Sequence, residues 1–361
     1  MVTILLAGML AFGVTYTLIP SIMKISRMKR LLDTADERKW HKDPTPTMGG
    51  IAIFFGIAVA LLLFLGDSAL MEVKNVLAMG LLLTLVGIKD DLIGVAPSWR
   101  LMVQAVIATV LFFSGVYLDS FYGIFGLYEI PILFGWLLNM LIITTVINAY
   151  NLIDGINGLS GGLGVIASSA FGMLFLSAGE IGWAMIAFVM CASLLAFLRF
   201  NFGKGEIFMG DTGTMILGFM ISVFCIQFTN IGFYDLEMNF VTMLVYSIII
   251  VPLLDLVRVF FTRIVSGKSP FSPDRSHVHH FFVDMGASHN NACFWIYGFN
   301  LVCILLVFQM NHMALWIQFT VLTLLAALSF VALYMVNQYR RKEKFRAKVA
   351  QIIPFGNQKA A

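Results

Sequence analysis

The sequence predicts an all-α polytopic membrane protein, and three observations support that fold class. Of its 361 residues, 60% are hydrophobic and only 12% are charged. A soluble domain carries about 25% charged residues, so this composition excludes an ordinary globular protein. The apolar residues also form uninterrupted runs of membrane length and do not alternate with polar ones, which favours helices over the strands of a barrel.

Eleven apolar segments come close to the roughly 17–25 residues that a transmembrane helix needs. The first has neither a basic start nor a small-residue cleavage site, so we expect an uncleaved helix and not a signal peptide. The predicted spans are 2–23, 49–65, 75–89, 101–118, 131–148, 161–178, 181–199, 212–230, 240–262, 292–310 and 313–336. They predict one membrane domain over residues 1–338, followed by a basic cytoplasmic tail over 339–361.

The distribution of basic residues predicts the orientation of these spans. With a periplasmic N-terminus and a cytoplasmic C-terminus, all of the 23 Lys and Arg residues except Lys74 lie on the cytoplasmic side. The positive-inside rule favours this topology over its inverse. The four cysteines fall in apolar runs without a CxxC spacing, and we expect buried free thiols at Cys191, Cys225, Cys293 and Cys303.

Four aspartates lie where apolar segments begin or end, namely Asp90, Asp91, Asp154 and Asp211. A carboxylate beside hydrocarbon is costly and therefore suggests a function. The topology puts all four at the cytoplasmic surface, where together they could hold a divalent cation. Asp90 and Asp91 close the third span, and adjacent helical residues point about 100° apart, so one could bind metal while the other faces a second ligand.

A polar segment, NAYNLIDGINGL at 148–159, follows the fifth span. Its Asn and Asp side chains offer oxygen ligands and amide donors, and its glycines allow tight turns. We interpret it as a loop that contacts a nucleotide or sugar or coordinates Mg²⁺. A simple turn rich in Asn and Gly is the structural alternative.

Asp211, in FMGDTGT at 208–214, opens the eighth span. It could cap that helix, and a helix N-terminus also attracts phosphate oxygens. Mg²⁺ usually binds through one or two carboxylates together with substrate phosphates, which suits this position. The segment therefore predicts a metal ligand at Asp211.

The loop after the ninth span carries Arg275, His277, His279 and His280. No cysteine accompanies them, so we interpret them as phosphate contacts and not as a zinc site. Lys39 and His41, before the second span, either bind substrate or only contribute to the inside positive charge. Asp255, deeper in the ninth span, could pair with Arg258, and its role is left open.

Taken together, these motifs resemble the polyprenyl-phosphate N-acetylhexosamine 1-phosphate transferase family (glycosyltransferase family 4). The resemblance covers nearly the whole chain and includes the Asp90–Asp91 pair, NAYNLIDGINGL, FMGDTGT and SPFSPDRSHVHH in the same order. The HVHH form is similar to the branch that makes undecaprenyl-diphospho-N-acetylglucosamine. The resemblance implies transfer of N-acetylglucosamine 1-phosphate from UDP-GlcNAc to undecaprenyl phosphate in the bacterial inner membrane, an initiating step for O antigen or a related glycan.

The resemblance also assigns roles to individual residues. Asp211 would ligate Mg²⁺, for which Mn²⁺ could substitute, and Asp91 would assist at the metal or at the diphosphate. Asp90 would position or deprotonate the lipid phosphate, and Asp154 would contact the nucleotide. The catalytic set is then Asp90, Asp91, Asp154, His277, His279 and His280, and the substrate-binding set is Asn148, Asn151, Asn157, Asn201, Arg275, Lys39 and His41. A homodimer is implied as well, and no nucleic-acid partner is expected.

One departure from the family pattern leaves the donor open. Asn157 stands where bacterial members usually have Asp, and a neutral amide cannot act as a base. Either this position only hydrogen-bonds the ligand, or the donor is another UDP-N-acetylhexosamine or UDP-MurNAc-pentapeptide. A secondary transporter, with sites near the midplane, and an aspartate-rich prenyltransferase are the other classes considered. Direct attack by the lipid phosphate is preferred to a phospho-aspartate at Asp90.

Overall fold

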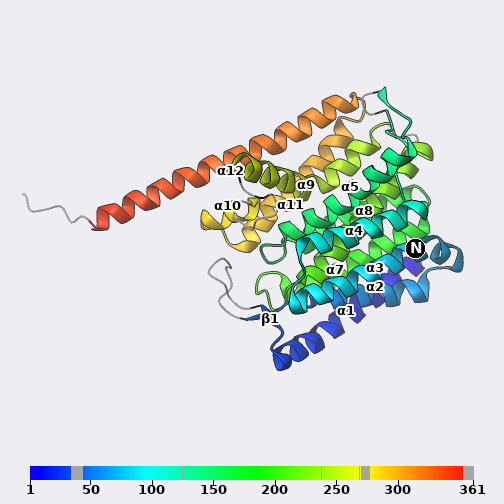
Figure 1. Ribbon diagram of the computed structural model, residues 1–361, viewed down its shortest axis with the longest axis horizontal. Coiled ribbons are helices and arrows are strands. Elements are labelled where there is room, and N and C mark those ends of the chain that lie inside the picture. Colours follow the sequence, from blue (N-terminus) through cyan, green and yellow to red (C-terminus); the bar gives the residue numbers. More distant parts are fainter. Residues whose placement is uncertain (34–43, 124–125, 237, 268, 270–276, 353–361) are drawn as a thin grey trace, which may run out of the picture.

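The computed structural model describes residues 1–33, 44–123, 126–236, 238–267, 269 and 277–352, and it confirms an all-α membrane architecture (Figure 1). The helices are α1 (Val2–Lys29), α2 (Gly49–Phe64), α3 (Asp67–Ile93), α4 (Pro97–Phe113), α5 (Ile132–Ile153), α6 (Leu159–Ser177), α7 (Ile181–Asn201), α8 (Gly210–Tyr234), α9 (Val241–Val265), α10 (Val278–Asp284), α11 (His289–Gln309) and α12 (Leu315–Ile352). The longer helices pack side by side as one bundle.

Each predicted span coincides with one helix. By length and composition, eight of the described helices could cross a membrane, whereas α2 and α4 are shorter apolar helices. The helix predicted at 75–89 is longer than expected because its polar flanks, including Glu72, Lys74 and Asp90, continue the helical hydrogen bonding as α3. Hydropathy marks the part of a helix that suits hydrocarbon and does not mark its ends.

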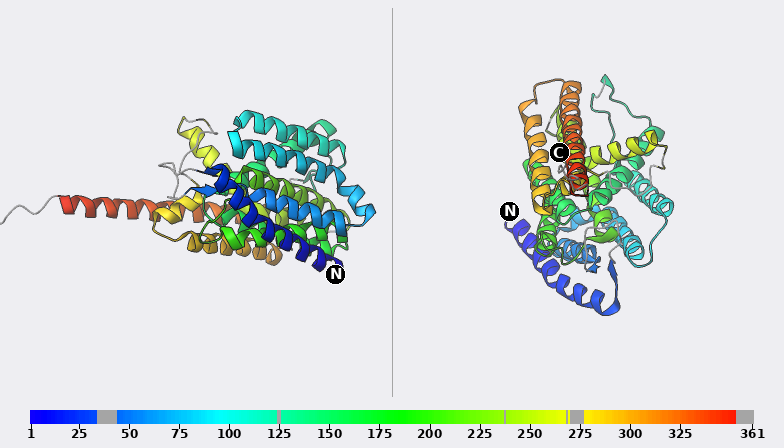
Figure 2. Two further views of the ribbon diagram at one scale, coloured as in Figure 1. Left: turned by 90° about the horizontal axis from the view of Figure 1, so that it is seen from below. Right: turned by 90° about the vertical axis from the view of Figure 1, so that its left-hand side faces the viewer.

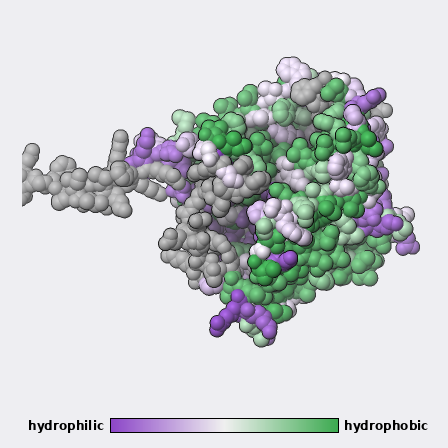
Figure 3. Space-filling view, viewed as in Figure 1, coloured by the Kyte–Doolittle hydropathy of each residue, from purple (hydrophilic) through white to green (hydrophobic). Residues whose placement is uncertain are grey.

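The exposed surface has the distribution that a membrane protein requires. Apolar residues cover much of the middle of the bundle, and hydrophilic residues gather toward its two ends (Figure 3). α12 continues past the bundle, so part of the predicted tail is helical (Figure 2). All four cysteines are buried and free, as predicted.

Helix α8 forms the centre of the bundle, and most of its side chains are buried. Glycines on its neighbours let backbones approach it closely. A Cβ atom at Gly50 of α2 would lie 2.1 Å from the backbone nitrogen of Gly213, and one at Gly87 of α3 would lie 2.4 Å from the Cα of Thr212. This packing brings the start of α2 and the end of α3 against the start of α8.

A small antiparallel sheet, which the sequence did not predict, lies between α1 and α2. Strand β1 (Leu32–Asp33) pairs with β2 (Thr45–Pro46). The chain after β2 is then fastened to the segment before α8, because the nitrogen of Phe208 donates to the oxygen of Pro46 at 2.8 Å. The connection between α1 and α2 thereby meets the connection between α7 and α8 at one end of the bundle, opposite the N-terminus (Figure 1).

Candidate active site

A cavity of about 620 Å³ opens at this end of the bundle. The four aspartates singled out from the sequence all line it, as expected from their common side of the membrane. The lining consists of Arg30, Leu31, Leu32, Thr47, Asp90, Asp91, Leu92, Asn151, Asp154, Gly155, Ile156, Asn157, Asn201, Phe208, Gly210, Asp211, Thr214 and His280. Its volume and its mixed apolar and polar walls suit a small-molecule substrate.

Asp91 holds the N-terminus of α8 from the neighbouring helix α3. Its Oδ1 accepts from the backbone nitrogen of Asp211 at 2.7 Å, and its Oδ2 accepts from the nitrogen of Thr212 at 3.1 Å and from its hydroxyl at 2.6 Å. The residue before α8 is Met209, so the interpretation of Asp211 as the cap of its own helix is wrong. Asp91 caps the helix instead, and both of its oxygens are already engaged.

Gly210 is required for this arrangement. Its φ of +72° lies in the left-handed region, and a Cβ there would meet the oxygen of Thr47 at 2.0 Å and Oδ2 of Asp91 at 2.6 Å. Any other L-residue would be strained and would push these groups apart. The glycine before Asp211 therefore allows the segment after β2, the end of α3 and the start of α8 to meet.

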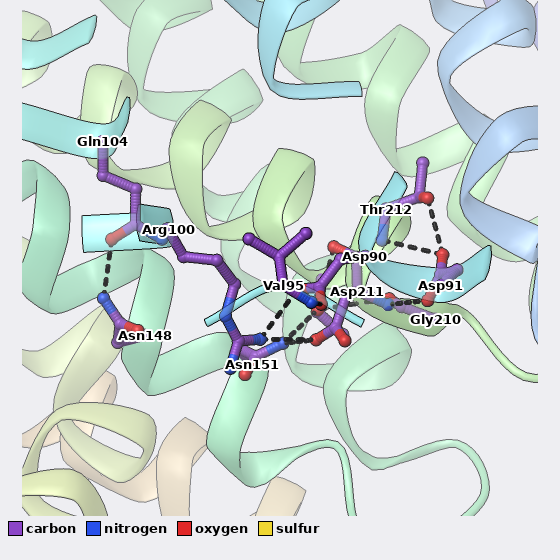
Figure 4. Close-up of polar contacts among 11 residues, drawn as sticks. Asp90, Asp91, Val95, Arg100, Gln104, Asn148, Asn151, Gly210, Asp211 and Thr212 are labelled. Atoms are coloured by element: carbon purple, nitrogen blue, oxygen red, sulfur yellow. Dashed lines mark hydrogen bonds and ion pairs between the residues drawn. The ribbon is translucent and has the colours of Figure 1, made fainter. Parts of the chain in front are cut away.

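Asp211 and Asp90 share one counter-charge, the guanidinium of Arg100 on α4. Its Nη1 lies 3.0 Å from Oδ2 of Asp90 and 3.3 Å from Oδ1 of Asp211 (Figure 4). Asp90 is nearly buried, and its Oδ1 also accepts from the nitrogen of Val95 at 2.7 Å. Arg100 did not emerge from the sequence, because a lone Arg at the start of a span contributes only to the topology.

The end of α5 brings amide groups to the same carboxylates. The segment predicted as a loop from 148 is helical as far as Ile153, because its Asn side chains find partners on neighbouring helices. The Nδ2 of Asn151 donates to Oδ1 of Asp211 at 2.5 Å and to the hydroxyl of Thr214 at 2.9 Å. Asn148 instead donates to Gln104 of α4 at 2.8 Å and is not part of the lining (Figure 4).

Asp154 follows α5 directly, and its carboxylate accepts a short hydrogen bond from the hydroxyl of Ser160 on α6. Burial raises the pKa of Asp154 to about 6. Asp154 ends one helix and Asp211 lies in the first turn of another, so both stand at the bundle's end. This position argues against a secondary transporter, whose binding site would lie near the midplane of the membrane.

Asn157 and Asn201 shape the loops on the far wall of the cavity. The Nδ2 of Asn157 donates to the oxygen of Gly203 at 3.4 Å. Asn201 accepts from the nitrogen of Gly158 at 2.6 Å and donates to the oxygen of Ile207 at 2.9 Å. An Asp at 157 could not make the bond to Gly203, because a carboxylate has no hydrogen to donate.

The three histidines have different surroundings. His280 lines the cavity, whereas His277 and His279 are buried and are not part of the lining. Burial and the neighbouring His280 hold the pKa of His279 well below its usual range. His277 is the residue before α10, so part of the predicted loop is a short helix. Arg275, Lys39 and His41 lie outside the described residues.

Comparisons with known proteins point to one family. The model of glycosyl transferase family 4 matches residues 73–229. An undecaprenyl-phosphate alpha-N-acetylglucosaminyl 1-phosphate transferase of Yersinia pestis is 33% identical over 268 residues, which are 73% of this chain and 72% of that protein. The Escherichia coli K12 protein of the same name is 32% identical over 74% of this chain and 73% of its own length. A Bacillus subtilis protein, a probable undecaprenyl-phosphate N-acetylglucosaminyl 1-phosphate transferase, is 28% identical over 90% of both chains.

Proposed function

The chain belongs to glycosyl transferase family 4, and from this premise we propose that it transfers N-acetylglucosamine 1-phosphate from UDP-GlcNAc to undecaprenyl phosphate. It is a multi-pass membrane protein. The observation that carries the proposal is the cavity at one end of the bundle, where three helices bring Asp90, Asp154 and Asp211 together. A site at helix ends can reach both a lipid phosphate at headgroup level and a water-soluble nucleotide sugar.

The proposed reaction is a single phosphoryl transfer. An oxygen of the lipid phosphate attacks the β-phosphorus of UDP-GlcNAc, and the bond from that phosphorus to the bridging oxygen breaks. The products are undecaprenyl-diphospho-GlcNAc and UMP. Such a reaction depends on positioning and on neutralising charge more than on covalent catalysis. In this proposal Arg100 and His280 attract the phosphates, while the Asn residues orient the nucleotide.

The surroundings of Asp90 favour direct attack over a phospho-aspartate. One of its oxygens accepts from Val95, and the other is paired with Arg100. A nearly buried carboxylate held in this way is a poor nucleophile, because attack through either oxygen would disrupt the contact that this oxygen makes. We therefore assign Asp90 to positioning the lipid phosphate or accepting its proton.

The donor atoms of the cavity suit Mg²⁺, with Mn²⁺ as a substitute. Within the described residues, no group of three His, Cys, Asp or Glu side chains is arranged to hold a metal alone. Mg²⁺ commonly takes only one or two carboxylates and completes its shell with water and substrate phosphates. Asp211 would hold the ion, because Asp91 is committed to capping α8. When bound, Mg²⁺ would neutralise charge on the diphosphate.

The proposed setting follows from the excess of basic residues at the same end of the bundle. By the positive-inside rule the cavity faces the cytoplasm, where nucleotide sugars are made available. The relatives are bacterial. We therefore propose the bacterial inner membrane as the setting and, as the sequence motifs imply, an initiating role in the synthesis of O antigen or another surface glycan.

The test is UMP release by detergent-purified protein. We expect release with UDP-GlcNAc, polyprenyl phosphate and Mg²⁺, and none when either substrate or the metal is withheld. Asp211→Ala should lose activity, whereas Asp235→Asn, an exposed aspartate at the opposite end of α8, should keep it. UDP-GalNAc and UDP-MurNAc-pentapeptide serve as competing donors. Faster turnover with either would overturn the donor assignment, and full activity in Asp211→Ala would overturn the metal assignment.

A further inference from the structure

A second group of charged residues, Asp255 and Arg258 of α9, lies beside the cavity but is not part of its described lining. Asp255 is only 1% exposed. Its Oδ1 accepts from Nη2 of Arg258 at 2.7 Å, and its Oδ2 lies 2.8 Å from Nδ1 of His277. A buried carboxylate is costly unless it is paired and hydrogen-bonded. The contacts made by Asp255 meet that requirement, so the question is what they hold in place.

The answer is α10, the short helix that carries His279 and His280. Besides its contact with His277, Asp255 accepts from the backbone nitrogen of Val278 at 3.0 Å, so it caps the first turn of α10. Arg258 adds a second contact between α9 and α10. Its guanidinium lies 5.2 Å from the ring centre of Phe281 on α10 and 5.4 Å from that of Phe330 on α12. The ion pair thus joins α9, α10 and α12.

The opposite side of α10 is fixed by close packing. His279 is 1% exposed and lies against Gly155, where a Cβ atom would come 2.0 Å from its Nε2. The ring centres of His279 and His280 are 4.2 Å apart. Because α10 has only two turns, any shift of its first turn would also move His280 relative to the cavity.

We propose that Asp255 and Arg258 are positioning residues, which present His280 to the diphosphate by holding α10 between α9 and α12. This inference rests on the proposed function, because it takes the diphosphate of a nucleotide sugar as the group that His280 meets. Asp255 acts here through α10 and touches no substrate. Its carboxylate plays the same part for α10 that Asp91 plays for α8.

A double-mutant cycle tests whether Asp255 acts through His280. We expect Asp255→Asn to lower kcat/KM by about tenfold or more, since coupled neighbours commonly show effects of that order. In a His280→Ala background, the same substitution should cause no further loss. Phe330→Leu keeps the ion pair and removes one ring beside Arg258, so it should give a smaller loss, about threefold, that also vanishes with His280→Ala. Asp235→Asn is the matched control.

Hydrogen exchange supplies a readout that does not depend on turnover. In Asp255→Asn, amides of residues 278–284 should exchange about tenfold faster, while those of α8 should be unchanged. Equal losses in the wild-type and His280→Ala backgrounds, or unchanged exchange in α10, would overturn the positioning role. A wild-type protein that releases no UMP would instead overturn the proposed function, and the exchange result would still decide whether Asp255 holds α10.

Discussion

Removing the carboxylate of Asp91 should destabilise the protein even when no metal is present. Asp91→Ala deletes three hydrogen bonds to the start of α8, two from backbone nitrogens and one from the hydroxyl of Thr212. Loss of a helix cap costs up to about 2 kcal/mol, and a further hydrogen bond contributes roughly 1 kcal/mol. The expected loss is therefore about 2–3 kcal/mol.

Thermal unfolding of the detergent-purified protein in EDTA measures this loss. For a chain of this length, 1 kcal/mol corresponds to about 1–2 °C, so the midpoint should fall by about 2–6 °C. Asp91→Asn keeps one acceptor oxygen and should lose less. Asp67→Ala removes an exposed aspartate at the opposite end of the same helix and should cost less than about 1 kcal/mol.

The result also separates two roles for Asp91. A capping residue lowers stability without metal, whereas a residue that only binds Mg²⁺ lowers metal affinity and leaves the metal-free protein as stable as before. An unchanged midpoint in EDTA together with weaker Mg²⁺ binding would refute our account and restore Asp91 as a ligand.

Three further predictions concern the cavity. Arg100→Gln should bind Mg²⁺ several-fold more tightly in the absence of substrate, because Asp90 and Asp211 lose their counter-charge. Isothermal titration calorimetry measures this affinity, and an equal or weaker affinity than in the wild type would contradict the prediction. Asn157→Asp should lower the free energy of unfolding by about 1–2 kcal/mol, since a carboxylate facing the oxygen of Gly203 cannot donate; an unchanged thermal midpoint at pH 7 would argue against it. Because burial raises the pKa of Asp154 to about 6, the folded state binds its proton more tightly than the unfolded chain. This group's contribution to stability is therefore full below pH 4 and is lost as the pH rises through 6. Asp154→Asn should flatten that part of the stability profile measured in EDTA, and an identical slope in the variant would count against the assignment.

Local composition was sufficient to find the long helices. Every predicted span coincides with a helix of the structure, because twenty apolar residues in hydrocarbon must satisfy their own backbone hydrogen bonds. The ends of the helices were harder to predict from the sequence. Polar residues such as Asp90 and Asn151 are helical here, and hydropathy stops short of them. The short helix α10 and the pair of strands were also missed. Asp255 of the distant helix α9 caps α10, and the oxygen of Pro46 in β2 accepts from the distant Phe208.

For the site, the sequence identified most of the polar side chains that line the cavity but not the contacts between them. The motifs supplied Asp90, Asp154, Asp211 and His280, and the charge distribution predicted that they share one side of the membrane. All four line one cavity in the structure. Their partners could not be inferred in the same way. Arg100 carries no motif, and it became part of the site only through its distance from two aspartates.

The sequence by itself determined that this chain forms a bundle of apolar helices with four aspartates at helix ends, because hydropathy and charge are properties of each segment alone. Only the tertiary structure decided which partner each carboxylate has and which of them holds another helix. Asp90 and Asp91 are adjacent in the chain, yet one pairs with an arginine on α4 and the other caps α8. Hydrogen bonds between helices depend on which faces pack together, and that choice is made by the whole bundle.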